Sequence, residues 1–310
     1  MKTICVLKGG ISSEREVSLV SGTAIANELR AMGFGVFELD PADHPNLDEL
    51  LASIKSQHAD LVFIGLHGGL GENGKLQAAL ELAGIPHTGS GFEACCVTMD
   101  KYLSKLVANA EGVPTPAYIL MRENLVNDYN TAEDLQGFLS GIGMPVVVKP
   151  NDGGSSVGIS LVSEIKDLKP AVKLAFKESK QVLVEQFIPG RELTVTVLDG
   201  LALPVVEIKP LKGWYDYQNK YTKGKTDYIA PAEIDPAVAQ LVQLYATRLW
   251  NAFGLKGYAR IDFRYNGAKA WFLEVNTLPG MTSLSLTPMA AKAAGISFSG
   301  LLERIINLSL

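Results

Sequence analysis

The chain is 310 residues long, with 47% hydrophobic residues, 20% charged residues and a formal net charge of −5. This length is enough for two or three domains that share a large buried core, and the composition is typical of an ordinary globular protein. The negative charge argues against a nucleic-acid partner and against a protein that binds membrane surfaces.

Targeting signals and cysteine usage both favour a cytoplasmic location. No apolar run approaches the roughly 20 residues of a membrane span, and the apolar run before Lys8 is too short for a signal peptide, so we expect neither. The three cysteines are Cys5, Cys95 and Cys96. Sequence neighbours rarely form a disulfide, and no metal-site spacing is present, which is typical of a reducing compartment.

The first hundred residues alternate between strand and helix patterns. We expect strands at residues 4–7, 35–39 and 60–66, a helix from a capping box of Ser13 and Glu16 to about residue 32, and a helix from an Asn46 cap to residue 55. Such alternation predicts a doubly wound parallel sheet, with ligands beyond the carboxyl ends of its strands.

Two polar residues of this unit lie at predicted strand ends. Glu14 is a candidate for binding substrate, although a negative charge that complements the helix dipole would explain it equally well. His67, after the third strand, is more often structural than functional at such a place. Gly9 and Gly10 lack the spacing of a dinucleotide fingerprint, so NAD binding is disfavoured.

A second unit is expected to begin near residues 98–100. Asp100 can cap a helix over 101–111, and a strand over 117–121 follows a proline-rich break. Lys149 lies within an apolar strand over 146–150, where burying a lysine is costly unless an anion binds to it. A Gly/Ser loop over 151–158 comes next, and its backbone N–H groups could approach an anion, although a plain hairpin is an equally good interpretation.

The following segments indicate a hinge, a hairpin and a lid. A strand over 182–188 leads to Glu192, and Asp199 with Gly200 favours a hairpin between strands at 192–198 and 201–208. Residues 210–232 show no period and mix tyrosines with lysines, which is typical of a lid. A nucleic-acid patch is the alternative, and it fits an acidic chain poorly. Helices are predicted from Asp235 to Gly254 and over 299–307.

The hairpin over 257–281 is the strongest candidate for a metal site. Apolar and polar residues alternate along both of its strands. We expect a three-residue loop with a bulge at Gly267, which would pair Ile261 with Leu273, Phe263 with Trp271 and Ala259 with Val275. One face is then apolar, and the other carries Arg260, Asp262, Glu274 and Asn276. Carboxylate and amide oxygens suit Mg²⁺, whereas the alternative is a solvated outer face.

These parts, in this order, resemble the ATP-grasp superfamily and, within it, the D-alanine–D-alanine ligases. The likeness covers nearly the whole chain. Its motifs occupy residues 9–19, 66–68, 89–91, 99–101, 148–150, 154–158, 215–217, 220–221, 257–262 and 274–283.

The resemblance implies an α/β and α+β fold: an N-terminal doubly wound parallel-sheet domain over 1–99, then a two-part ATP-grasp fold over 100–184 and 185–310, with the lid at 210–232. It implies that ATP activates one D-alanine as an acyl phosphate, that a second D-alanine attacks it, and that the dipeptide enters peptidoglycan synthesis. It also implies a cosubstrate ATP, two Mg²⁺ that Mn²⁺ could replace, and a homodimer. Another carboxylate–amine ligase and a non-catalytic nucleotide sensor are the alternatives.

By position, the resemblance also implies roles for individual residues. Nucleotide binding falls to Lys101, Lys149, Gly154, Ser156, Glu185, Phe187, Ile188, Glu192 and Lys220, with Glu192 on the ribose. The metal ligands are Asp262, Glu274 and Asn276. Substrate binding and catalysis fall to Glu14, His67, Ser155, Tyr221, Arg260, Gly280, Ser285 and Leu286, with Arg260 and the Gly280 N–H as oxyanion donors. Tyr221 favours a dipeptide over an ester product, whereas Leu284 and Lys8 depart from the family pattern without touching an implied ligand.

Overall fold

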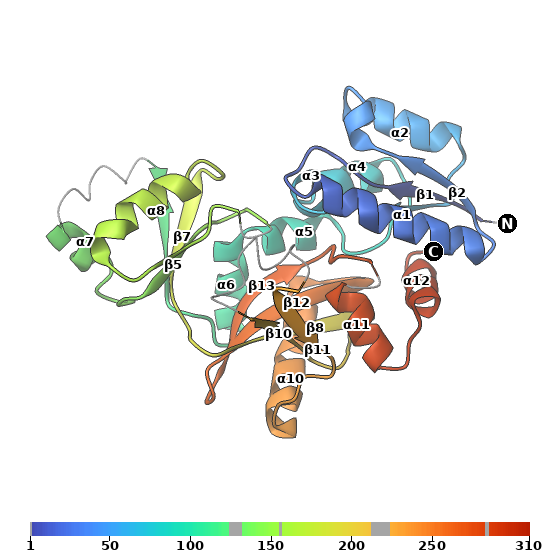
Figure 1. Cartoon of the computed structure of the whole chain (residues 1–310). Coiled ribbons are helices and arrows are strands. Elements are labelled where there is room, and N and C mark those ends of the chain that lie inside the picture. The colour runs from blue at the N-terminus through green and yellow to red at the C-terminus, as the bar shows by residue number, and fades with distance from the viewer. Residues whose placement is uncertain (1, 124–131, 155–156, 212–223, 283–284) are drawn as a thin grey trace.

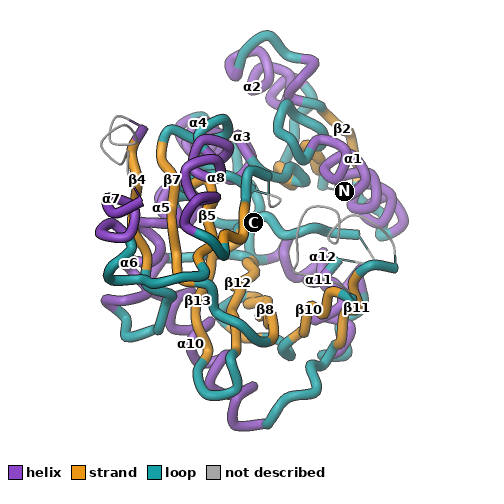
Figure 2. Tube along the Cα trace, turned by 60° about the vertical axis from the view of Figure 1, so that its left-hand side comes forward, coloured by secondary structure: helices purple, strands orange, loops and turns teal. Residues whose placement is uncertain are grey.

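The computed structural model describes residues 2–123, 132–154, 157–211, 224–282 and 285–310 (Figure 1). Three sheets organise the described chain: a parallel sheet near the N-terminus, a four-stranded sheet in the middle and a six-stranded sheet near the C-terminus. Figure 2 shows the four-stranded sheet at the left, the six-stranded sheet in the lower half and the N-terminal unit at the upper right. No helix in these described ranges has the length and apolar character needed to cross a membrane.

The N-terminal sheet has the order β2-β1-β3 and is parallel throughout, which confirms the predicted architecture. Its strands are apolar because the sheet is covered: all four residues of β3 are buried. The elements are β1 (Thr3–Leu7), α1 (Arg15–Ala31), β2 (Gly35–Leu39), a 3-10 turn (Pro41–Asp43), α2 (Leu47–Ser56), β3 (Leu61–Ile64), α3 (Gly69–Glu72), α4 (Lys75–Leu82) and α5 (Phe92–Met99).

Capping residues were predicted correctly at two helix starts and wrongly at a third. Asn46 and Asp100 each accept a backbone N–H of the first turn, as predicted, and Asp235, predicted only as a helix start, does the same. The Ser13–Glu16 capping box is wrong, because α1 begins at Arg15 and its N-cap residue makes no side-chain capping bond. The neighbouring hydroxyl of Ser12 instead donates to the carbonyl of residue 67 at 2.7 Å, which ties the loop after β1 to the loop after β3.

The middle sheet is antiparallel, in the order β4-β7-β5-β6. Valines of β5 and β7 pack against α8, as at Val146, Val184 and Val172, and form a core separate from the other two. The sheet stands at the left of Figure 1. Its elements are β4 (Tyr118–Arg122), α7 (Ala132–Phe138), β5 (Val146–Pro150), β6 (Ser160–Val162), a 3-10 turn (Ile165–Asp167), α8 (Leu168–Ala175) and β7 (Gln181–Gln186).

The largest sheet runs β11-β10-β8-β12-β13, with β9 paired to β8. Helices α10 and α6 pack against it, and both contact β13. Its elements are β8 (Arg191–Leu198), β9 (Leu201–Ala202), β10 (Val206–Pro210), β11 (Thr226–Ile229), α10 (Pro236–Phe253), β12 (Tyr258–Tyr265) and β13 (Ala270–Asn276), with α6 at Lys101–Ala110. Part of the expected lid is therefore a strand, because β11 pairs with β10, whereas residues 212–223 lie outside the described ranges.

The predicted register of the C-terminal hairpin is wrong by two residues at Ile261 and by one at Phe263, which lie on either side of a bulge. Ile261 pairs with Val275 and Phe263 with Phe272, so the extra residue of the bulge is Leu273, in β13, rather than Gly267. Four residues, 266–269, form the turn. A bulge in mid-strand shifts the face of every side chain beyond it, so Phe272 enters the core in place of Trp271.

The last two helices return to the N-terminal unit. Helix α12 (Phe298–Asn307) lies beside α1, and it shares a hydrophobic core with β1 through residues such as Leu301 and Ile305 (Figure 1). Helix α11 (Leu286–Ala293) joins the same core and contacts β8. The first and last parts of the chain are thereby packed together around the segment that follows β13.

Candidate active site

A cleft between the middle sheet and the largest sheet collects most of the residues expected to bind nucleotide and metal. It lies where β5, β7 and the Gly/Ser loop face β12 and β13. The predicted residues on its wall are Lys101, Lys149, Gly154, Glu185, Phe187, Ile188, Glu192, Arg260, Asp262 and Glu274. Leu273, the bulge residue, lines it too, because the bulge turns that side chain away from the core.

The four polar residues of the hairpin share one face despite the register error. Asp262 is paired with Glu274, and Arg260 with Asn276. Arg260 Nε and Nη2 each donate to the carboxylate of Asp262 at 2.9 Å, and the hydroxyl of Thr194 donates to it at 2.6 Å. The prediction of a shared face holds because the bulge lies beyond Asp262 and Glu274, toward the turn.

The donor set on this face fits Mg²⁺. Asn276 Oδ1 is buried and has no hydrogen-bond partner among the described residues. Two carboxylates and one amide oxygen are hard ligands, and they leave coordination positions for water and phosphate oxygens, as Mg²⁺ prefers. Within the described ranges, no three His, Cys, Asp or Glu side chains come together as a metal cluster. The face therefore suits a metal that a nucleotide helps to hold.

Lys101 joins the Gly/Ser loop to the metal face. Its Nζ donates to the carbonyl of Gly153 at 2.6 Å and lies 3.3 Å from Glu274 Oε2. Helix α6 begins at Lys101, and the Asp100 cap fixes that start. The ammonium group is consequently held where a phosphate bound between the loop and the hairpin would meet it.

Lys149 belongs to a buried charge triad. Its Nζ lies 2.6 Å from Glu185 Oε1, and Lys105 Nζ lies 2.9 Å from Glu185 Oε2. Burial opposes ionisation of Glu185, but the two ammonium groups outweigh it and lower the pKa of that carboxyl. Both carboxylate oxygens are engaged by lysines, so any part of Glu185 in framing adenine falls to its backbone. Sequence reasoning missed Lys105, although its place one turn after Lys101 put both on one helix face.

Arg264 bonds to the predicted hinge, residues 188–192, and sequence reasoning missed it. Arg264 donates to the carbonyls of Ile188 and Gly190 at 3.1 and 2.9 Å and to Glu192 Oε2 at 3.2 Å. Its guanidinium lies 5.8 Å from the ring centre of Phe187. Burial raises the pKa of Glu192 to about 7, with Arg264 opposing the shift. The signal was available, since Arg264 shares a strand face with Arg260 and Asp262.

Glu14 faces the Gly/Ser loop from the N-terminal unit. A Cβ at Gly154 would stand 2.7 Å from Glu14 Oε2, and a Cβ at Gly68 would stand 2.5 Å from the same oxygen. Glycine at both positions therefore admits this carboxylate between two loops. Glu14 is also the N-cap residue of α1, so its charge favours the helix N-terminus as well.

His67 and Glu72 fasten the segment after β13 to the N-terminal unit. The Nδ1–H of His67 donates to the carbonyl of Leu278 at 2.8 Å, and Ser21 Oγ lies 2.9 Å from Nε2. Glu72 accepts the N–H groups of Gly68 and Leu278 at 2.9 and 3.2 Å. Burial, then Glu14, raises the pKa of Glu72 to about 7. Sequence reasoning missed Glu72, which lies in a glycine-rich run that gave no periodic signal.

The remaining predicted residues fall into two groups. Gly280 lies close to Ser285, whose Oγ would be 2.8 Å from a Cβ at position 280, and Leu286 is buried at the start of α11. Ser285 Oγ also accepts the N–H of Thr282 at 3.1 Å. The other group, Ser155, Ser156, Lys220 and Tyr221, lies outside the described residues, as does Leu284.

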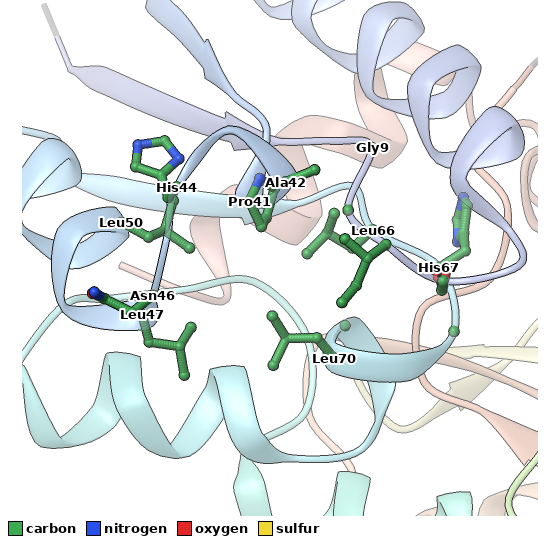
Figure 3. Close-up of a pocket in the computed structure, with 15 residues that line it drawn as sticks. Gly9, Pro41, Ala42, His44, Asn46, Leu47, Leu50, Leu66, His67 and Leu70 are labelled. Carbon is green, nitrogen blue, oxygen red and sulfur yellow. Dashed lines mark hydrogen bonds between the residues drawn. The ribbon is translucent and has the colours of Figure 1, made fainter.

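A second hollow lies within the N-terminal unit, between the loops that follow β1, β2 and β3 (Figure 3). Leu47, Leu50, Leu66 and Leu70 supply much of its wall. His44 on its rim is already bonded, with Nδ1 3.0 Å from the carbonyl of residue 40 and Nε2 3.1 Å from a serine hydroxyl. None of the described residues that line this hollow is an aspartate, glutamate or lysine, so the charged cleft is the better candidate for chemistry.

Comparison with known proteins decides the family. A family model described as D-ala D-ala ligase C-terminus matches residues 107–307, and one described as D-ala D-ala ligase N-terminus matches residues 38–90. The chain belongs to the D-alanine–D-alanine ligase family. The resemblance expected from the sequence motifs is thereby confirmed.

Individual relatives support the same assignment over the whole chain. A D-alanine–D-alanine ligase of Gloeobacter violaceus is 45% identical over 309 residues, which cover 99% of each chain. The crystal structure of a D-alanine–D-alanine ligase from Bacillus anthracis has a TM-score of 0.86 and 33% identity, and covers 100% of this chain and 97% of that one. A structure of the Bacillus anthracis enzyme complexed with ATP has a TM-score of 0.83 and 30% identity, with the same coverage. The predicted α/β and α+β architecture is confirmed by these matches.

Proposed function

We propose that this chain joins two D-alanine molecules into D-alanyl-D-alanine, with release of ADP and phosphate, for peptidoglycan synthesis. One observation carries the proposal: Asp262 and Glu274 line the same cleft as Lys101 and Lys149. Oxygen ligands for metal and cations for phosphate are thus within one cavity. Family membership supplies the substrate class.

The first step transfers a phosphoryl group. A carboxylate oxygen of the first D-alanine attacks the γ-phosphorus of ATP, the bond to the β,γ-bridging oxygen breaks, and ADP leaves with that electron pair. Lys101 and Lys149 neutralise charge on the phosphates, and Glu192 accepts hydrogen bonds from the ribose hydroxyls. Phosphoryl transfer depends mainly on positioning and charge neutralisation, so these contacts account for most of the protein's contribution.

Two Mg²⁺ ions are part of the proposal. Asp262, Glu274 and Asn276 would hold them, with Mn²⁺ as a substitute, and the ions would neutralise charge on the phosphates. The buried and unpartnered Oδ1 of Asn276 supports a cation at this face. Neighbouring Arg260 reduces the net negative charge of this face through its contact with Asp262.

The second step forms the peptide bond. The amine of the second D-alanine attacks the acyl carbon, the tetrahedral oxyanion collapses, phosphate leaves with the electrons of the C–O bond, and the amine gives up a proton. Arg260 and the Gly280 N–H would stabilise that oxyanion. Glu14 would hold the ammonium of the first D-alanine, with Ser155 and Tyr221 linked to it. Ser285 and Leu286 would line the second subsite, and His67 would position the 278–281 segment through Leu278.

The proposal also includes a cytoplasmic location and a homodimer. A cytoplasmic location is supported by the three cysteines, which are all free. A homodimer rests on the family resemblance alone. Neither affects the chemistry assigned to the cleft.

The decisive assay follows ADP release with purified protein, MgATP and a panel of D- and L-amino acids. We expect release that depends on D-alanine, with D-alanyl-D-alanine identified by mass spectrometry. A preference for any L-amino acid would eliminate the proposed substrate. ATP binding without ADP release under every condition would favour a nucleotide sensor instead. Reactions without an amino acid provide the background rate.

A further inference from the structure

Lys105 is a completely buried lysine that the proposed chemistry does not use. It lies on α6, its side chain is 0% exposed, and its ammonium contacts Glu185 and donates to Thr115 Oγ1 at 2.8 Å. Lysine is almost never fully buried without a partner, and burying its charge is costly. An apolar residue of similar length would fill this space at lower cost, so the charge itself calls for an explanation.

The net charge of the group formed by Lys105, Glu185 and Lys149 explains why a charged residue is buried here. Glu185 lies between two ammonium groups, Lys149 at 2.6 Å and Lys105 at 2.9 Å, so the ionised triad carries a net charge of +1. Only Lys149 of the two lysines lines the cleft. Without Lys105, Lys149 and Glu185 would form a neutral ion pair. An anion entering the cleft would then meet little net positive charge at Lys149.

Lys105 is also held from the side of the largest sheet. Thr115 Oγ1, which accepts this hydrogen bond, donates in turn to the carbonyl of Phe272 in β13 at 3.0 Å. The ammonium lies 5.7 Å from the ring centre of Tyr118 in β4. Lys105 thus connects the strand that carries Glu185 with the strand that carries Glu274, and its position is fixed from both sheets.

We propose that Lys105 is a positioning residue for nucleotide binding: it neutralises Glu185 so that Lys149 keeps its positive charge for the phosphates. This inference rests on the proposed function, which assigns phosphate binding to Lys149. Lys105 itself does not touch the nucleotide, since its side chain is entirely buried behind Glu185.

A dependence on pH follows from the surroundings of Lys105. Glu185 in β7, Lys149 in β5, Tyr118 in β4 and, at longer range, Glu274 in β13 are the titratable groups that face it. Burial lowers the pKa of Lys105 to about 8, with Glu185 opposing the shift. The charged form is the one that frees Lys149, so nucleotide affinity should fall as pH rises through about 8.

The test replaces Lys105 by methionine, which keeps the length of the side chain and removes its charge. Calorimetric titration with a non-hydrolysable ATP analogue and Mg²⁺ should show an affinity about tenfold lower than that of wild type, the usual effect of one charge at short range. The melting temperature without nucleotide should fall, because Glu185 Oε2 and Thr115 Oγ1 lose their buried cationic partner. Lys173→Met, on the exposed face of α8, is the matched control and should bind as wild type does.

A double variant separates electrostatics from packing. Adding Glu185→Gln to Lys105→Met restores the net charge of +1 to the group around Lys149, so the double variant should recover most of the lost affinity. A purely structural role for Lys105 predicts that the double variant binds no better than the single one. That result, or wild-type affinity for Lys105→Met, would overturn the proposal.

Lys149→Met distinguishes the failure of this inference from the failure of the proposed function. If Lys149→Met binds the analogue as wild type does, phosphate binding by Lys149 is wrong and the role of Lys105 fails with it. If only Lys149→Met loses affinity, the nucleotide assignment stands and the inference about Lys105 alone is wrong. Should Lys105→Met not fold, the wild-type affinity between pH 7 and 9 decides, and a flat profile would refute the proposal.

Discussion

Two walls of the cleft carry opposite charge surpluses. On the middle sheet, Glu185 is paired with two lysines and its pKa is lowered. On the largest sheet, Glu192 has one arginine partner at 3.2 Å, and burial with the nearby charge of Asp262 helps to raise its pKa to about 7. Both carboxylates are buried, so burial alone does not explain the difference. The neighbouring charged groups decide whether the pKa of the buried carboxyl is raised or lowered.

The contrast matches what each wall would bind. A positive surplus favours phosphate oxygens, whereas carboxylates in excess favour metal cations and can accept hydrogen bonds from sugar hydroxyls. Lys101 lies between the two walls, with one contact to the Gly/Ser loop and one to Glu274. A bound nucleotide with its metals would supply the charges that each wall lacks.

The largest expected effect comes from removing charge on the acidic wall. Glu274→Gln should lower kcat by at least about 100-fold, because the proposed metal ligand and much of its charge are lost together. Coupled-enzyme measurement of ADP release at saturating D-alanine would test this. Glu303→Gln, on the exposed face of α12, is the control for the same chemical change. Near-normal turnover in Glu274→Gln would refute the metal assignment.

Arg260 lies on the same wall but has a different expected role. Arg260→Met should lower kcat about 100-fold through loss of one oxyanion donor, at roughly 3 kcal/mol of barrier, with little change in nucleotide affinity. Because Arg260 also contacts Asp262, its removal should leave the Mg²⁺ requirement unchanged or shifted to lower concentration. Steady-state kinetics at varied Mg²⁺ would show this. A large loss of ATP affinity with unchanged kcat would contradict the oxyanion role.

The raised pKa of Glu192 predicts a pH dependence of stability. The folded protein binds this proton more tightly than the unfolded chain does, so stability should fall as pH rises from 4.5, the usual value of the group, toward about 7. Glu192→Gln should remove part of that fall and be more stable than wild type at pH 8 by about 2 kcal/mol, but not at pH 4.5. The variant should keep part of the pH dependence of stability, because the pKa of Glu72 is also raised to about 7. Denaturant unfolding at the two pH values would measure this, and equal stability differences would refute it.

The smallest expected effect concerns the loop that presents Glu14. Asp40 accepts the N–H of Gly10 at 2.8 Å and pairs with Arg15 at 2.7 Å, so it holds both ends of that loop. Asp40→Asn should raise KM for D-alanine a few-fold, on the order of one weakened charged hydrogen bond, with unchanged ATP affinity. Asp167→Asn is the control for the same chemical change, because Asp167 is exposed in the middle unit, away from this loop. Equal effects of both variants would argue against a specific role of Asp40.

Local patterns in the sequence were sufficient for much of the fold. Helix starts at Asn46, Asp100 and Asp235 were predictable because a capping side chain acts on backbone groups two or three residues away. The metal face was predictable for a similar reason, since alternation along two short strands puts Asp262 and Glu274 on the same side. Both depend on neighbours in the chain or across one hairpin.

Other features depended on contacts that no local pattern encodes. The bulge at Leu273 escaped prediction because sequence alternation fits two registers, and packing of Phe272 against Phe263 selects one of them. Strand β11 was missed because a short edge strand gains its stability from pairing with β10 rather than from its own period. Arg264 and Glu72 were missed because their partners lie 72 and 206 residues away.

By itself, the sequence determined the family, the order of parallel and antiparallel units, and the oxygen-bearing face of the C-terminal hairpin, because motif spacing and side-chain alternation are local properties. Only the tertiary structure decided that Glu185 lies between Lys149 and Lys105, and that the last helix packs beside the first. Charge pairing and burial depend on distances between segments far apart in the chain. The same buried carboxyl group can therefore be made more or less acidic by partners that the sequence does not reveal.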